Sequence, residues 1–206
     1  MSMKAIKFGL ATAAMACMVS FGAVAQSNST SQSDSSKSAS SGSASGQVSA
    51  ADKTFVMKAA QGGLAEVELG KLAADKGQSD DVKKFGQRMV DDHSKANDQL
   101  KSVAQQKNIA VPTEPSAKDK ALKDKLSGLS GAQFDKVYMQ HMVMDHKKDI
   151  AEFQKEANSG KDPDIKNFAS QTLPTLQEHL KMAQQASQST TAAKTKSSTT
   201  ASNQQQ

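Results

Sequence analysis

The sequence is poor in the residues that disulfides, β-sheets and large aromatic side-chain cores require. Its 206 residues include one cysteine, four prolines, one tyrosine and no tryptophan. Val, Ile and Thr do not alternate with polar residues over long stretches, so strands are not expected. Ala, Leu, Lys, Gln, Glu and Met are abundant in the middle of the chain and favour helices. The composition therefore predicts an all-α protein with a core built mainly from Leu, Met, Val, Ala and Phe.

The first 25 residues have the pattern of a secretory signal peptide. Lys4 and Lys7 form a positive end, residues 8–24 are apolar and mostly small, and Ala-Val-Ala at 23–25 is a small-x-small cleavage site. The apolar stretch is too short and too rich in Ala to predict a membrane anchor. We therefore expect cleavage after Ala25 and a mature protein that is periplasmic or secreted.

The single cysteine, Cys17, lies inside this signal. Its removal would leave a chain without a thiol, which excludes disulfides and cysteine-based redox chemistry. A lipoprotein anchored through Cys17 is the less favoured alternative, because Ala-Met-Ala at 14–16 is a poor lipobox and the apolar stretch continues past the cysteine.

The positive net charge of the full chain does not indicate a nucleic-acid-binding protein. Over residues 49–186, 21 basic side chains are matched by 20 acidic ones. No basic patch interleaved with aromatic residues occurs, so nucleic acid is not expected as a partner. No transmembrane segment is expected after signal removal, and the partners that remain are a second copy of the chain or another envelope protein.

Two segments rich in small and polar residues flank one predicted domain. Residues 26–48 are mostly Ser, Ala, Gly and Gln, and residues 187–206 are mostly Ser, Thr, Ala and Gln. Such segments bury too little apolar surface to offset the loss of chain entropy, so both are predicted to be disordered tails. The predicted folded domain is residues 49–186.

Apolar periodicity and end signals predict four long helices in this domain. Gly77 and Gly160 are typical of helix C-termini, and Ser79 and Pro163 are typical of helix starts. The predicted helices cover 51–76, 80–107, 132–158 and 163–186, with a short extra helix at 117–126. Because the first and last connections are short, we expect an antiparallel up-down-up-down four-helix bundle with both short turns at one end.

The chain also contains an internal repeat. The second predicted helix opens with Asp-Val-Lys-Lys-Phe at 81–85, and the fourth opens with Asp-Ile-Lys-Asn-Phe at 164–168. Each of these segments follows a long helix and a short turn. The first helix pair is therefore interpreted as a copy of the second.

Each long helix carries one inward polar residue near its middle. Two similar segments, at 87–95 and 140–148, each contain an Asp-His pair. At 1.5 Å per residue, one polar residue from each helix lies roughly 18–27 Å from its short turn. The residues of this polar layer are Glu66, His93, His146 and His179.

Two interpretations of the polar layer remain open. In the first, its residues bind a divalent transition metal (Zn, Fe, Mn or Cu), because imidazole and carboxylate ligands suit these ions. Neighbouring acids would then orient the imidazoles through hydrogen bonds: Asp92, Asp145, Asp149 and Glu178. In the second, the layer is a buried hydrogen-bonded network without a metal, in an envelope or stress-related module that is not an enzyme. Buried histidines that charge near pH 5–7 would also make the bundle pH-responsive.

Several of these residues together resemble a known family. The resemblance covers about 51–186 and rests on Phe55, Glu66, Leu69, Phe85, Met89, Val90, Asp92, His93, Phe134, Asp135, Tyr138, His146, Leu173, Pro174, Glu178, His179 and Leu180. The family is the bacterial domain of unknown function 4142, whose members are often labelled outer-membrane proteins. The resemblance implies an exported, ferritin-like helical bundle and brings no established activity.

The chain departs from the ligand pattern of ferritin-like di-iron proteins. Those proteins use Glu-x-x-His on two helices and one Glu on each of the others. Here Val90 lies three residues before His93, and Leu176 lies three residues before His179. A carboxylate-bridged di-iron centre is therefore not expected, and a mononuclear site rich in histidine, or no metal, is favoured.

Overall fold

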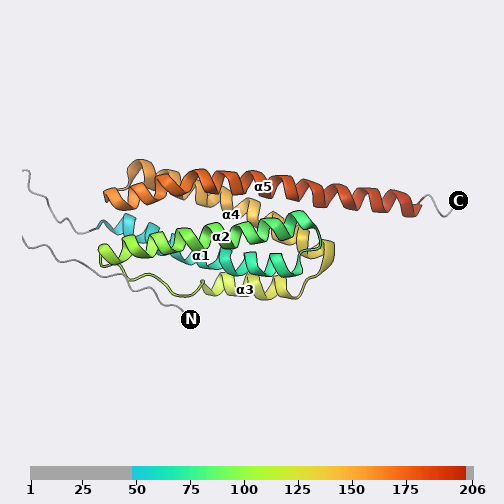
Figure 1. Ribbon diagram of the computed structural model, residues 1–206, viewed down its shortest axis with the longest axis horizontal. Coiled ribbons are helices and arrows are strands. Elements are labelled where there is room, and N and C mark those ends of the chain that lie inside the picture. The colour runs from blue at the N-terminus through green and yellow to red at the C-terminus, as the bar shows by residue number, and fades with distance from the viewer. Residues whose placement is uncertain (1–47, 203–206) are drawn as a thin grey trace, which may run out of the picture. The chain divides into compact units, whose positions relative to one another are not determined.

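The described part of the protein, residues 48–202 of a computed structural model, consists of helices and connections without any strand. The helices are α1 (Ala50–Lys76), α2 (Asp80–Gln106), α3 (Ala117–Ser127), α4 (Gly131–Ser159) and α5 (Pro163–Ser202) (Figure 1). The all-α prediction is confirmed, and the helix limits lie within one residue of the predicted ones except at the end of α5. The predicted signal peptide, 1–25, and nearly all of the predicted linker, 26–48, lie outside the described residues.

Serine side chains cap three of the helices at their first turn. Ser49 accepts a hydrogen bond from the Asp52 amide at 3.1 Å, and Ser79 accepts one from the Val82 amide at 3.2 Å. Ser116 does the same at the start of α3. These contacts satisfy backbone N–H groups that have no partner within the helix, which explains why local sequence signals located the helix starts well.

Each short connection between long helices is held by an aspartate from the other helix pair. Asp135, near the start of α4, accepts hydrogen bonds from the amides of Gln78 and Ser79, both at 2.8 Å. Asp52, near the start of α1, accepts from the amides of Lys161 and Asp162. The start of α4 therefore lies beside the α1–α2 turn, and the start of α1 lies beside the α4–α5 turn.

The long helices enclose two apolar clusters. The first core cluster includes Leu69, Phe85, Met142 and Ala183, and the second includes Phe55, Leu100, Phe153 and Leu176. Along the chain, α1 and α5 pass from the second cluster to the first, whereas α2 and α4 pass from the first to the second. The main contacts join α1 to α2, α4 to α5, α2 to α5 and α1 to α4, and α3 packs on α1 and α4.

The predicted up-down-up-down order with both short turns at one end is wrong. The α1–α2 turn lies at the first core cluster and the α4–α5 turn at the second, so the turns lie at opposite ends (Figure 1). The cause is the connection over 107–130, which contains α3 and returns the chain along the length of the helices before α4 begins. The polar layer still forms, because its residues lie near the middle of their helices and are thus at a similar depth from either end.

Helix α5 also differs from the prediction at its C-terminal end. A disordered tail was predicted from Ser187, but the helix continues to Ser202. Extending an existing helix needs no new nucleus, so low apolar content alone does not end it. Within the part of α5 whose burial is described, Ala186 is the last buried residue.

Candidate metal centre

The polar layer lies between the two core clusters and is shielded from solvent. Its four residues are at most 5% exposed: Glu66, His93, His146 and His179. Phe85 of the first core cluster packs its ring against His146 and His179, with centroids 6.4 Å from each. The structure thus brings one acid and three imidazoles from four helices to one level.

Two of the imidazoles are held in defined orientations by acceptors. Nδ1 of His146 lies 3.0 Å from the carbonyl oxygen of Met142, which can only accept, so Nδ1 carries the proton. Nε2 of His179 lies 2.9 Å from Oδ2 of Asp92. Burial acts to raise the pKa of Asp92, but hydrogen bonds from His179 and Arg88 hold it below its ordinary value. Asp92 is therefore ionised and accepts, and His179 donates through Nε2.

These two orientations leave two lone pairs facing each other. Nε2 of His146 and Nδ1 of His179 are 3.4 Å apart, and each belongs to a neutral ring whose other nitrogen already donates. Neither atom has a proton to offer the other. Two acceptors at this distance in a buried site repel each other unless a proton or a metal ion lies between them.

The third imidazole and the acid contain further atoms without partners. Nδ1 of His93 pairs with Oε2 of Glu66 at 3.0 Å. Among the described residues, Nε2 of His93 and Oε1 of Glu66 are buried and form no hydrogen bond. One nitrogen of each of His93, His146 and His179 lies within 4.8 Å of the others, so three potential ligand atoms converge.

The electrostatics of the layer keep its imidazoles neutral. Burial lowers the pKa of His93 well below its ordinary value, and the neighbouring His179 and His146 lower it further. Burial also lowers the pKa of His146, to about 4, and lowers that of His179 despite the opposing effect of Asp92. Neutral imidazole is the form that binds metal ions.

The predicted orienting acids have different roles in the structure. Asp92 does orient an imidazole, but it is that of His179 on α5 rather than that of its sequence neighbour. Glu178 is more than half exposed and pairs with Arg88 at 3.6 Å. Asp145 and Asp149 do not hydrogen-bond to the three buried imidazoles of the described residues; both lie near Glu66, on the side of the layer that faces a cavity.

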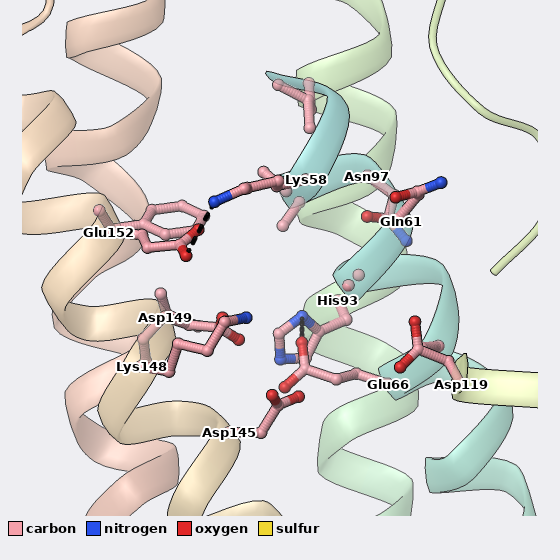
Figure 2. A pocket seen from close by; sticks show the side chains of 18 of the residues that line it. Lys58, Gln61, Glu66, His93, Asn97, Asp119, Asp145, Lys148, Asp149 and Glu152 are labelled. Carbon is pink, nitrogen blue, oxygen red and sulfur yellow. Dashed lines mark hydrogen bonds and ion pairs between the residues drawn. The ribbon is translucent and has the colours of Figure 1, made fainter. Parts of the chain in front are cut away.

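This cavity, of about 220 Å³, opens next to the polar layer between α1 and α4. Figure 2 shows Glu66 and His93 at its inner side, with Asp145 and Asp149 of α4 reaching toward Glu66. Other polar residues that line the cavity, and that the sequence did not single out, include Lys58, Gln61, Asn97, Asp119, Lys148 and Glu152. The sequence did contain one signal for this cavity: Asp145 and Asp149 are four residues apart, which places both carboxylates on the same face of a helix.

Comparisons with solved structures show where this fold has been seen. The crystal structure of a DUF305 fragment from Deinococcus radiodurans is similar with a TM-score of 0.59 and 15% identity, over 68% of this chain and 96% of that one. The structure of CopM in the Cu(I)-bound form is similar with a TM-score of 0.57 and 17% identity, over 67% of this chain and 96% of that one. At these identities the similarity shows the fold alone. No curated protein matches the sequence.

A family model covers nearly all of the helical part of the chain. It matches residues 37–186, and its C-terminal limit coincides with Ala186, the last buried residue in the part of α5 whose burial is described. The match agrees with the resemblance inferred from the sequence. The chain belongs to the family described as "Domain of unknown function (DUF4142)".

Proposed function

We propose that the protein binds one transition-metal ion through His93, His146 and His179. The observation that carries the proposal is the pair of lone-pair nitrogens on His146 and His179, 3.4 Å apart. Two ligands at about 2.0–2.1 Å from a tetrahedral ion are separated by about 3.3–3.4 Å, so this spacing suits an ion between them. Nε2 of His93, buried without a partner among the described residues, supplies the third ligand.

The ligand chemistry favours copper or zinc within the predicted set of Zn, Fe, Mn and Cu. Imidazole nitrogens suit Zn, Cu and Fe, whereas Mn prefers oxygen ligands. The Cu(I)-bound state named for CopM, a protein of similar fold, supports copper as one of the two. Asp92, the Met142 carbonyl and Glu66 would hold the outer ring nitrogens, a common arrangement around metal-bound histidines.

We further propose a ferritin-like four-helix bundle with one long crossover for the long helices α1, α2, α4 and α5. The crossover is the connection through α3, and the opposite directions of each contacting helix pair support the assignment. The signal-like residues 1–25 support export to the periplasm or the exterior. No described helix is long and apolar enough to cross a membrane.

Metal binding by matched histidine variants of the full mature chain tests the proposal. His146→Gln removes a buried ligand, and His141→Gln makes the same change one and a half turns earlier on α4, at a histidine outside the trio. We expect about one equivalent of Zn²⁺ or Cu to bind wild type and His141→Gln alike, and His146→Gln to bind at least about 100-fold more weakly. Isothermal titration and elemental analysis after dialysis measure both.

The alternative function, a hydrogen-bonded network without metal, predicts a different outcome. The Glu66–His93 pair at 3.0 Å and the Asp92–His179 pair at 2.9 Å are the contacts that favour it. In that case wild type would retain no metal after dialysis, and His146→Gln would lower the free energy of unfolding without changing metal content.

A further inference from the structure

The inner end of the cavity contains carboxylates that the histidine site does not use. Glu66, Asp145 and Asp149 each offer an oxygen, and these oxygens lie within 4.8 Å of one another. Figure 2 shows the three carboxylates facing one space beside the layer. Glu66 comes from α1, whereas both aspartates come from α4, so the group spans two helices that contact each other.

The basic side chains nearest this carboxylate group form only long ion pairs with its two aspartates. Lys148 approaches Asp149 only to 3.7 Å, and its side chain is 62% exposed. His141 lies 3.9 Å from Asp145. Glu66 itself is 2% exposed, and its Oε1 has no hydrogen-bond partner among the described residues; Nε2 of His146 lies 3.5 Å from it, in a ring that is neutral. A buried carboxylate oxygen without a hydrogen bond at the wall of a cavity points to a ligand there, because desolvation without compensation is costly.

We infer that Glu66, Asp145 and Asp149 form a second cation site, which takes a hard divalent ion such as Mn²⁺ or Ca²⁺. Carboxylate oxygens are the ligands that these ions prefer, in contrast to the imidazoles of the first site. The cavity of about 220 Å³ leaves room for the water molecules that complete the coordination of such ions. Because Glu66 also pairs with His93, the two sites adjoin through one side chain.

This inference goes beyond the histidine site and does not depend on it. The two sites differ in ligand atoms and in the ions that they select, although both take residues from α4. Asp145 and Asp149 belong only to the second site, and His146 is a ligand only of the first, with its Nε2 3.5 Å from Oε1 of Glu66. Variants of these residues can therefore separate the two.

Titration of the full mature chain with Mn²⁺, followed by electron paramagnetic resonance, tests the second site. The test variant is Asp145→Asn/Asp149→Asn, which keeps side-chain shape, and the matched control is Asp75→Asn/Asp91→Asn, which makes the same charge change at exposed positions. We expect wild type, the control and His146→Gln to bind about one Mn²⁺, and the test variant to bind at least about tenfold more weakly. Ca²⁺ should compete with Mn²⁺.

Each contrary outcome overturns this inference. Mn²⁺ binding that is unchanged in the test variant would place the ion elsewhere, and absence of binding by wild type at millimolar Mn²⁺ would remove the site. Loss of Mn²⁺ binding in a folded His146→Gln variant, checked by circular dichroism, would mean one shared site. If His146→Gln instead keeps its Zn²⁺ or Cu affinity while the test variant loses Mn²⁺, the histidine site fails and the carboxylate site stands.

Discussion

Asp92 and Glu66 each hold an imidazole that belongs to a different helix. Asp92 of α2 pairs with His179 of α5, and Glu66 of α1 pairs with His93 of α2. Neighbours in sequence point about 100° apart around a helix, so an acid beside a histidine in the chain faces another partner. The sequence predicted which residues lie at the same level, but not which of them pair. The depth estimate places residues only to within two helical turns, and hydrogen bonding depends on much shorter distances.

Replacing the acceptor of His179 should weaken metal binding without removing a ligand. In Asp92→Asn the group facing Nε2 of His179 is no longer ionised, so the ring is held less firmly in the tautomer that leaves Nδ1 free. We expect the Zn²⁺ affinity to fall about 10- to 100-fold. Asp91→Asn, at the exposed neighbouring position, is the control and should bind as wild type does. Equal affinities for all three proteins would show that Asp92 does not orient His179.

The buried carboxyl of Asp149 should make stability depend on pH in a defined direction. Burial, and next the nearby Asp145, raise its pKa from 3.8 to about 7. A raised carboxyl pKa contributes stability that is complete below pH 3.8 and is lost as pH rises through 7. At about 1.36 kcal/mol per unit, the loss is at most on the order of 4 kcal/mol.

Comparison of wild type with Asp149→Asn isolates this effect. His146, with its pKa lowered to about 4, contributes the opposite dependence, because its stability contribution is lost as pH falls from 6.5 toward 4. Urea unfolding in chelator at pH 4, 6 and 8 should show Asp149→Asn gaining stability relative to wild type as pH rises. A constant difference between the two proteins would contradict the raised pKa.

Helices α1 and α2 approach closely where two glycines meet. A Cβ on Gly86 would lie 2.7 Å from the amide nitrogen of Ala74 and 2.7 Å from the carbonyl oxygen of Gly70.

The ends of these helices were predictable because capping depends on nearby residues. The direction of α4 was not, because it depends on how the chain crosses through 107–130 and packs α3.

Alanine at two glycines should have opposite effects on stability. Gly86→Ala forces backbone atoms apart, so we expect a loss of about 1–3 kcal/mol in the free energy of unfolding. Gly62→Ala places its Cβ where no atom lies within 4 Å and should stabilise α1 by up to about 1 kcal/mol. Chemical denaturation of both variants checks this. A Gly86→Ala protein as stable as wild type would mean that α1 and α2 can separate freely.

At the scale of the whole molecule, the four residues of the polar layer lie at one level even though the predicted directions of α4 and α5 were wrong. The depth argument assumed that both short turns lie at one end, whereas they lie at opposite ends. Glu66 and His146 lie near the middle of α1 and α4, so reversal of a helix hardly changes their depth. The detail that the sequence could not supply, the facing nitrogens of His146 and His179, arises from side-chain orientation across helices.

The C-terminal part of α5 should be dispensable for the folded core. Among residues whose burial is described, none beyond Ala186 is buried. Removal of residues 190–206 should therefore leave the Tm unchanged within about 2 °C, a shift smaller than that expected from a change of 1 kcal/mol. Differential scanning calorimetry of the truncated and full chains measures this. A clearly lower Tm would show that the segment packs on the core or on another copy of the chain.

The most direct test of the proposed function is X-ray absorption spectroscopy of the protein loaded with Zn²⁺ or Cu and dialysed. Binding by His93, His146 and His179 predicts about three nitrogen ligands at about 2.0–2.1 Å with imidazole scattering, and loss of this signal in His146→Gln but not in His141→Gln. A spectrum without imidazole ligands, or a protein that retains no metal, would contradict the proposed site.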